Sequence, residues 1–131
     1  MTVAADTSFL IALFTDEPRA VEARETFARL KEKREKVFIP FQAIVEVIYV
    51  LEKFYKLERP RVTEYVLSIL NTFIFIVEKD EFLYRVLDGY VRFPAIGVGD
   101  IIIAEQAREM NISRILTFDR HFEKLGMNTS C

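Results

Sequence analysis

Four acidic residues stand in mostly apolar stretches of this chain of 131 residues: Asp6, Glu46, Asp100 and Asp119. Between Val3 and Phe14 the only polar residues are Asp6, Thr7 and Ser8. An ionised carboxylate in an apolar setting is costly unless it finds hydrogen-bond donors, a basic residue or a metal ion. Taken singly, Asp6 or Asp100 also suits a helix N-cap, Glu46 a partly exposed helix position and Asp119 a turn.

The segment 95–122 places two of these acids around one helix and one strand. It reads as a loop, a helix opened by Asp100, a break at Asn111 and a short strand that ends in Thr117-Phe118-Asp119. The apolar run after Asp100 and the pair Ile115-Leu116 both predict burial. In open α/β sheets, ligands bind outside the carboxyl ends of the strands, which is where Asp119 is expected.

The other two acids belong to the first half of the chain. Residues 2–5 predict a short buried strand, and Thr7 or Ser8 then offers an N-cap for an apolar helix over 9–14. Residues 37–39 predict a second strand, and Pro40 opens a helix that continues through Tyr55 and carries Glu46. Asp6 is therefore expected at a strand-to-helix turn, and Glu46 inside a helix.

Strand and helix patterns alternate along the whole chain. Helices are expected from Asp16 to about Glu35, from Pro60 onward and from Asp80 to about Arg92, with strands over 73–77 and near 127–129. The run 73–77 is apolar throughout, which is typical of a strand covered on both faces. The alternation predicts one α/β domain over residues 1–131, with three α/β/α layers around a central parallel sheet of four or five strands.

If the strands and helices meet in this way, the four carboxylates converge. Like charges that lie close together destabilise the fold unless a cation lies among them. Ligation by oxygen atoms alone selects a hard ion, Mg²⁺ or Mn²⁺. A zinc site is not indicated, because the chain has one histidine and one cysteine. That histidine, His121, is interpreted as a surface loop residue, although it could touch a phosphate group.

The order and spacing of these residues resemble the PIN-domain nucleases, and the chain length resembles their VapC-type toxins. The resemblance covers the whole chain and rests on Asp6-Thr7-Ser8 after the first strand, Glu46 in the third helix, Asp100 with Ala104, and Thr117-Phe118-Asp119 before Phe122. It implies that the acids bind one or two divalent metals and that RNA is cleaved. It also implies that the hydroxyls of Thr7, Ser8 and Thr117 orient the acids or the water.

The same resemblance implies two protein partners, a cognate antitoxin and a second copy of the chain in a homodimer. The cluster Phe54, Tyr55 and Leu57 is a compatible surface, or else part of the core. Other functions remain open: housekeeping RNA processing, a phosphate-accepting α/β domain, or a non-catalytic binding module. A phosphate acceptor requires paired acids after the first strand, whereas Asp6 is single; a binding module usually loses acids, whereas all four are present.

The composition and charge of the chain limit its possible binding partners and cellular location. The formal net charge of −2 does not indicate general nucleic-acid binding. Two basic groups, interleaved with glutamates, are interpreted as solvated faces: Arg29, Lys31, Lys33, Arg34 and Lys36, and then Lys53, Lys56, Arg59 and Arg61. The single cysteine, Cys131, excludes an internal disulfide, and neither a signal peptide nor a membrane span is recognised. We therefore expect a cytoplasmic protein.

Overall fold

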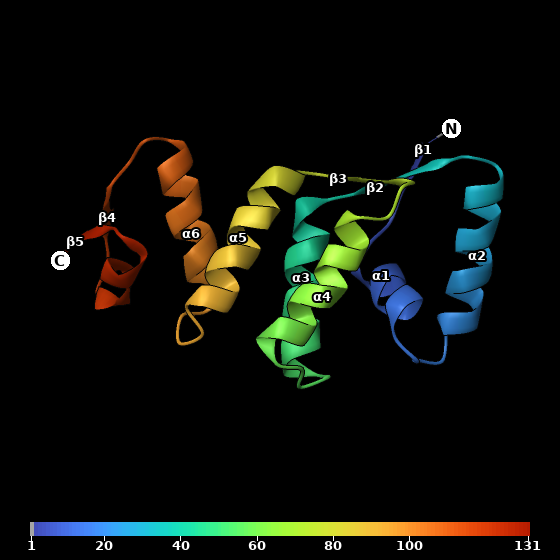
Figure 1. Ribbon diagram of the computed structural model, residues 1–131, viewed down its shortest axis with the longest axis horizontal. Coiled ribbons are helices and arrows are strands. Elements are labelled where there is room, and N and C mark those ends of the chain that lie inside the picture. The colour runs from blue at the N-terminus through green and yellow to red at the C-terminus, as the bar shows by residue number, and fades with distance from the viewer. Residues whose placement is uncertain (1) are drawn as a thin grey trace. The chain divides into compact units, whose positions relative to one another are not determined.

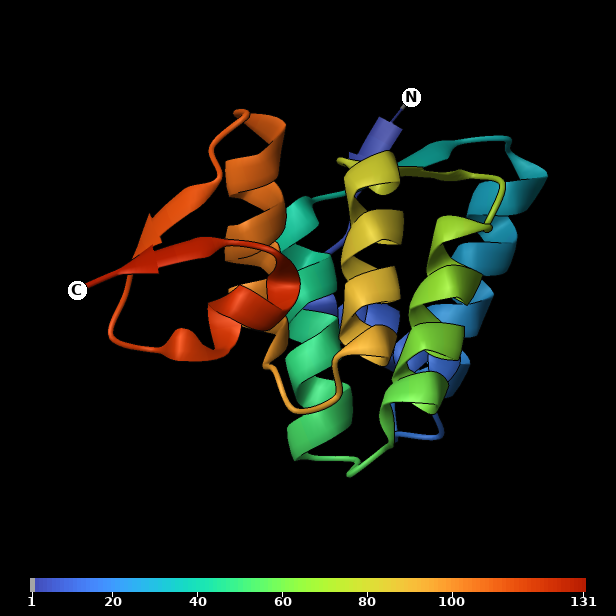
Figure 2. The ribbon, with the colours of Figure 1, turned by 60° about the vertical axis from the view of Figure 1, so that its left-hand side comes forward.

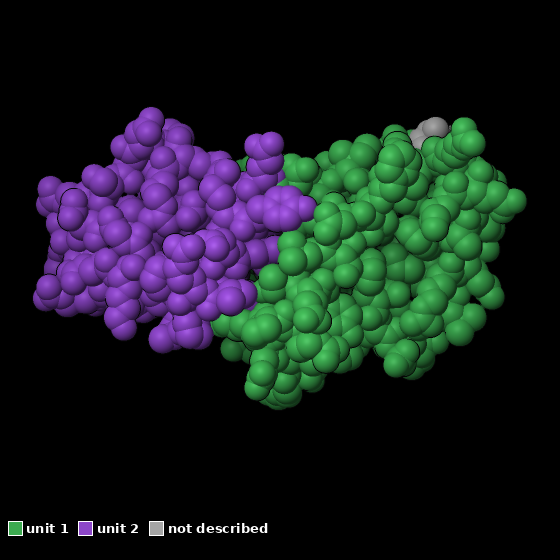
Figure 3. All heavy atoms as spheres, in the orientation of Figure 1, with its two compact units in different colours: residues 1–80 green, residues 81–131 purple. Residues whose placement is uncertain are grey.

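The computed structural model describes residues 2–131 and divides the chain into two compact units. Unit 1 extends to Asp80, and unit 2 is Glu81–Cys131; Figure 3 colours them separately. Each unit is described by itself. No helix among the described residues has both the length and the apolar character that crossing a membrane requires.

Unit 1 alternates parallel strands with pairs of helices. Its elements are β1 (Thr2–Ala4), α1 (Thr7–Phe14), α2 (Ala20–Glu32), β2 (Lys36–Ile39), α3 (Phe41–Lys53), α4 (Arg59–Leu70) and β3 (Phe75–Val77) (Figure 1). The strands form a sheet in the order β1-β2-β3, with Val3 opposite Val37 and Phe38 opposite Ile76. Parallel neighbours need a long crossover, and each helix pair supplies one.

Helix α3 is the central helix of unit 1. Ile44, Ile48 and Leu51 follow the helical period along one face and are fully buried. Each such side chain contributes about 1.5–3 kcal/mol by its removal from water. The helix packs against α1 and α4, and α4 lies beside it in Figure 1. This packing fixes the helix that carries Glu46.

Unit 2 consists of two helices followed by a small parallel sheet. Its elements are α5 (Asp80–Arg92), α6 (Val98–Glu109), β4 (Arg114–Leu116), the 3-10 helix η1 (Arg120–Leu125) and β5 (Asn128–Ser130). Strands β4 and β5 pair with Ile115 opposite Thr129, and η1 connects them (Figure 2). Gly126 follows η1 with a φ of 83°, a left-handed conformation that glycine adopts without strain.

The α/β class with parallel strands is confirmed, and every expected helix and strand is present. The expectation of one central sheet of four or five strands is not confirmed, because the five strands of the described residues form one sheet of three and one of two. The three layers and the single domain over residues 1–131 stay predictions.

The strands are shorter and less covered than their apolar sequences predict. Val3 of β1 is half-buried and Ala4 is exposed, while in β4 Leu116 is 77% exposed. Phe73 precedes β3 and is 87% exposed, and Ile76 within β3 is 47% exposed. The expectation of buried strands was therefore wrong at these positions. The reason is that edge strands and a two-stranded sheet have too few neighbours to cover both faces.

Helix α2 also differs from its predicted bounds. It begins at Ala20 rather than at Asp16, because the preceding residues form a turn in which the Ala20 N–H donates to the Glu17 carbonyl at 2.9 Å. It ends at Glu32 rather than near Glu35. Arg34 has a φ of 57°, which is incompatible with a continued right-handed helix. Lys33 and Arg34 thus lie in a turn and Lys36 begins β2, so none of these basic residues lies on a helix face.

Candidate functional site

Asp6 lies between β1 and α1 and caps the helix. Its Oδ1 accepts hydrogen bonds from the Phe9 N–H at 3.2 Å and from the Ser8 hydroxyl at 2.8 Å. The Ser8 hydroxyl, followed by the Phe9 N–H, lowers the pKa of the Asp6 carboxyl below its ordinary value. The expected cap at Thr7 or Ser8 is therefore wrong, because the carboxylate one residue earlier reaches the free amide first.

The residue that follows Asp6 supports Glu46, the second acid of unit 1. The Thr7 hydroxyl donates to Glu46 Oε2 at 2.7 Å, which joins the start of α1 to the exposed side of α3. Neither Glu46 nor Asp6 forms a salt bridge within the described residues. Two neighbouring hydroxyls, rather than cations, support the two acids of unit 1.

Asp6 and Glu46 line one open hollow of 570 Å³ in unit 1. Its wall also contains the apolar side chains Val50, Phe54 and Tyr55. Phe54 is 80% exposed, so the alternative that it belongs to the core is wrong. The hollow, which Glu17 and Arg19 also line, therefore combines charged side chains with an apolar wall that a partner can contact.

The acids of unit 2 follow different local structures. Helix α6 begins at Val98 after Gly97, whose backbone is extended, so Asp100 lies in the first turn and not at the cap. The expectation that Asp100 opens the helix was wrong by two residues, because glycine already serves as the cap. Asp119 follows β4 and caps η1, where its Oδ1 accepts from the His121 N–H at 3.2 Å.

His121 connects the two acids of unit 2. Its Nε2 lies 2.8 Å from Asp100 Oδ2, and its Nδ1 lies 3.1 Å from Asp119 Oδ1. The imidazole is only 25% exposed. The interpretation of His121 as a surface loop residue was therefore wrong. The contact between Asp119 and His121 has a signal in the sequence, the spacing Asp-x-His at the start of a tight turn. A carboxylate that caps such a turn lies beside the ring two residues later.

One oxygen each from Asp100 and Asp119 and one ring nitrogen of His121 lie within 4.8 Å of one another. The two carboxylates of the donor set fit a hard divalent cation such as Mg²⁺ or Mn²⁺, and the imidazole adds a nitrogen ligand of the kind that transition metals accept. Two carboxylates at this separation repel each other, and either a protonated imidazole or a bound cation offsets that repulsion.

Thr117 shapes the turn that presents Asp119. Its hydroxyl accepts a hydrogen bond from the Asp119 N–H at 2.9 Å. This contact involves the backbone of Asp119 and not its carboxylate. Thr117 therefore orients the acid through the main chain, in contrast to Thr7 and Ser8, which bind carboxylate oxygens directly.

The structure thus brings the predicted acids together in two pairs. Asp6 and Glu46 share the hollow of unit 1, and Asp100 and Asp119 share the cluster with His121 in unit 2. Among residues 2–131, the three residues of unit 2 are the only histidines, cysteines or acids grouped closely enough to hold an ion in this structure. The assignment of all four acids to one site stays a prediction.

Comparison with known proteins identifies related chains. The family model described as the PIN domain matches residues 3–127. A VapC ribonuclease of Aquifex aeolicus is 35% identical over 125 residues, which are 95% of this chain and 92% of that protein. A crystal structure of VapC20 from Mycobacterium tuberculosis, described as a toxin that cleaves the Sarcin-Ricin loop, is 20% identical with a TM-score of 0.44 and covers 97% of this chain and 96% of its own. The family assignment rests on the first two matches.

Proposed function

The chain belongs to the PIN-domain family, among its VapC-type ribonucleases, and on that premise we propose that it is a Mg²⁺- or Mn²⁺-dependent endoribonuclease that acts as the toxin of a toxin–antitoxin pair. The observation that carries the proposal is the cluster of Asp100, Asp119 and His121, whose ligand atoms lie within 4.8 Å. Such a cluster suits a divalent cation and gives a chemical role to the single acid in the first turn of α6 and to the acid that follows β4.

The proposed active site contains all four acids. Asp6 and Asp100 are metal ligands, while Glu46 and Asp119 complete the site directly or through water. In support, Asp6 and Asp119 each follow the carboxyl end of a parallel strand, which is where α/β proteins bind ligands. Each of the four also has a donor or a ring nitrogen that holds its carboxylate or its turn in place.

The reaction is the hydrolysis of an RNA phosphodiester bond. The oxygen of a water molecule forms a bond to phosphorus, the bond to the leaving ribose oxygen breaks, and the proton lost by the water balances the one gained by that oxygen. The chemistry supplied by a bound cation is Lewis-acid polarisation of the phosphate. Glu46, held by Thr7, and Asp119, held by its turn, position the water; Ser8 orients Asp6, and His121 orients Asp100.

The proposed partner surface is the apolar wall of the hollow in unit 1. Val50, Phe54 and Tyr55 lie beside Asp6 and Glu46, so a bound antitoxin segment would also cover the two acids. Burial of the 80% exposed Phe54 contributes binding energy through the hydrophobic effect. The toxin is proposed to be a homodimer.

The test is RNA cleavage by the purified full chain with Mg²⁺, with Mn²⁺ and with EDTA. We expect cleavage with either ion and none with the chelator. Undiminished cleavage in EDTA contradicts the metal-dependent mechanism. Asp88 provides a matched control, since Asp88→Asn removes an exposed acid of unit 2 outside the proposed site and should leave cleavage unchanged.

The role as a toxin requires a separate experiment. A small reading frame directly upstream of the gene should encode a peptide that stops cleavage, and Phe54→Ala should weaken that inhibition without loss of cleavage. If no such peptide exists, housekeeping RNA processing becomes the better account of the same chemistry.

A further inference from the structure

A second hollow of unit 1 combines aromatic and basic side chains. It has a volume of 820 Å³, and its wall includes Phe27, Lys31, Arg34, Lys36, Phe73 and Ile74. Its charged lining residues are all cationic. The first basic group of the sequence thus contributes three charges to one concave surface instead of a solvated helix face.

One aromatic ring of this hollow, that of Phe73, is open to ligands. Phe73 is 87% exposed, although burial of an aromatic ring is strongly favourable. The Lys36 ammonium lies 4.1 Å from its ring centroid, and the Lys31 ammonium lies 5.5 Å from that of Phe27. Phe27 is fixed by an edge-to-face contact with Phe75, with centroids 5.7 Å apart. Cations are thus held next to exposed π-surface.

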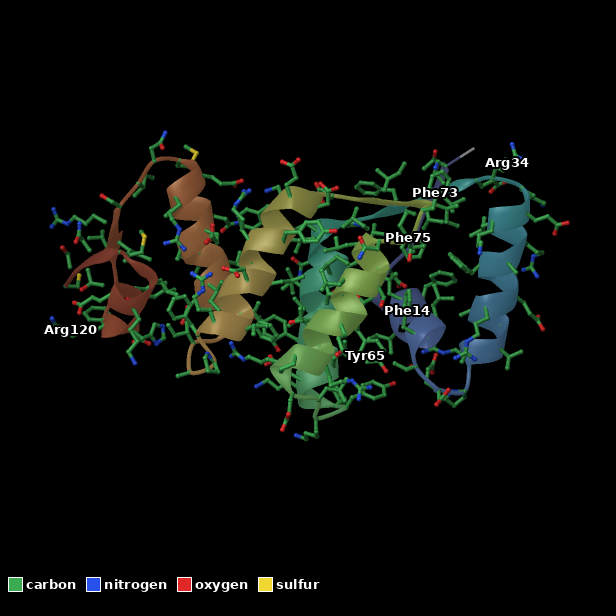
Figure 4. All side chains as sticks on the ribbon, in the orientation of Figure 1. Phe14, Arg34, Tyr65, Phe73, Phe75 and Arg120 are labelled. Carbon is green, nitrogen blue, oxygen red and sulfur yellow. The ribbon has the colours of Figure 1, made fainter. Side chains whose placement is uncertain are left out.

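The hollow lies at the amino ends of the strands, whereas Asp6 lies at their carboxyl ends. Lys36 begins β2 and Phe73 precedes β3, whereas Asp6 follows the carboxyl end of the parallel strand β1. Arg34 and Phe73 both lie at this end of unit 1 (Figure 4). A strand of four residues spans about 13 Å, so a ligand of this hollow does not reach the acids unless it is an extended chain.

We propose that this hollow binds a single-stranded segment of the RNA, at a distance from the bond that is cleaved; this inference rests on the proposed ribonuclease function. A base stacks on the face of Phe73 not covered by Lys36, and the phosphates on either side contact Lys31, Arg34 and Lys36. Positively charged grooves with aromatic platforms are how proteins bind single strands without reading their sequence. An acidic peptide would match the charges but leave the exposed ring without a partner.

The first test is RNA binding by the full chain, in EDTA, with a fluorescent oligouridylate of roughly 16 nucleotides, the upper site size of a single-strand binding fold. We expect Phe73→Leu, which keeps an apolar side chain but removes the π-face, to weaken binding by about 5- to 100-fold, while Phe73→Trp retains it. Lys36→Gln should also lower the slope of affinity against salt by about 0.7. Lys33→Gln is the matched control, because Lys33 belongs to the same basic run but does not line the hollow.

The second test separates this inference from the proposed function. Hydrolysis of bis(4-nitrophenyl) phosphate with Mn²⁺ reports on the active site alone, and Phe73→Leu should leave its rate unchanged. If the parent hydrolyses neither this compound nor RNA, the proposed function fails. Unchanged RNA affinity of Phe73→Leu overturns the inference, as does equal competition by polyglutamate. If Phe73→Leu abolishes self-association of the chain, the inference is also overturned, because the hollow is then an interface between two copies of the chain.

Discussion

The two units support their acids in different ways. In unit 1, Asp6 and Glu46 each accept a hydrogen bond from one neighbouring hydroxyl, at 2.8 and 2.7 Å. In unit 2, a single imidazole lies between Asp100 and Asp119. A hydroxyl donates whatever the pH, whereas a neutral imidazole has one N–H and donates to only one acid at a time.

This difference separates two functions of the supporting groups. In unit 1 the Ser8 hydroxyl favours the ionised carboxylate of Asp6 without a cation, so that acid is ready to accept a ligand. The acids of unit 2 are connected through the imidazole of His121. A cation bound there either displaces the imidazole from the carboxylates or binds beside it. We therefore expect unit 2 to respond more strongly to metal, and unit 1 to depend more on its own hydrogen bonds.

The largest expected effect is on cleavage. If the two pairs of acids serve one reaction, Asp6→Asn and Asp100→Asn should each lower RNA cleavage by at least about 100-fold, because each removes a charge from the reacting centre. Initial rates with Mg²⁺ and Mn²⁺ measure this. Asp16→Asn is the control, as its acid is fully exposed and lies outside both groups. If only the variant of one unit loses activity, the two pairs do not form one site.

The second prediction concerns metal and stability. A ligand that binds only the folded state adds about 2.7 kcal/mol at 100 times its Kd, which raises the Tm by about 10 °C for a chain of this size. We expect this gain for the parent and a much smaller one for Asp100→Asn. Thermal unfolding with EDTA and with saturating Mn²⁺ measures it. An equal gain in the variant would place the ion elsewhere.

The third prediction compares His121 with Thr7. His121→Ala should weaken Mn²⁺ binding by about 10- to 100-fold, the usual cost of removing a group that orients metal ligands. Thr7→Val removes only one hydrogen bond to Glu46 and should cost about 0.5–1.5 kcal/mol of stability. Calorimetric titration with Mn²⁺ and denaturant unfolding give the two values. If Thr7→Val weakens Mn²⁺ binding more than His121→Ala does, unit 1 is the more sensitive to metal.

The smallest expected effect is on acid titration. Because the folded-state pKa of Asp6 is lowered, its contribution to stability is present above the ordinary pKa and is lost as the pH falls through that lowered value, below about pH 4. Ser8→Ala should raise the pKa and reduce this loss. In unit 2, Thr129→Val should likewise raise the pKa of Glu123, which the Thr129 hydroxyl and then Arg120 hold below its ordinary value. Carboxyl NMR titrations measure both, and unchanged pKa values would contradict the assigned causes.

Local sequence patterns predicted most of the fold. The apolar period of α3, the proline before it and the alternation of strands with helices identified the elements and their parallel class. They predicted less about where elements begin, because several residues compete for each cap: Asp6 precedes Thr7, and Gly97 precedes Asp100. They also predicted too much burial for Phe73 and Leu116, since an apolar residue is covered only if other elements reach it.

The sequence alone selected the residues that are proposed to carry the chemistry. Lone acids in apolar stretches, with hydroxyls beside them, identify Asp6, Glu46, Asp100 and Asp119 because an unsupported carboxylate there is costly. Only the tertiary structure decided what supports each acid. The contact of Thr7 with Glu46 joins residues 39 apart, and that of His121 with Asp100 joins residues 21 apart. Such contacts depend on how helices pack and turns close, and local propensity does not encode those distances.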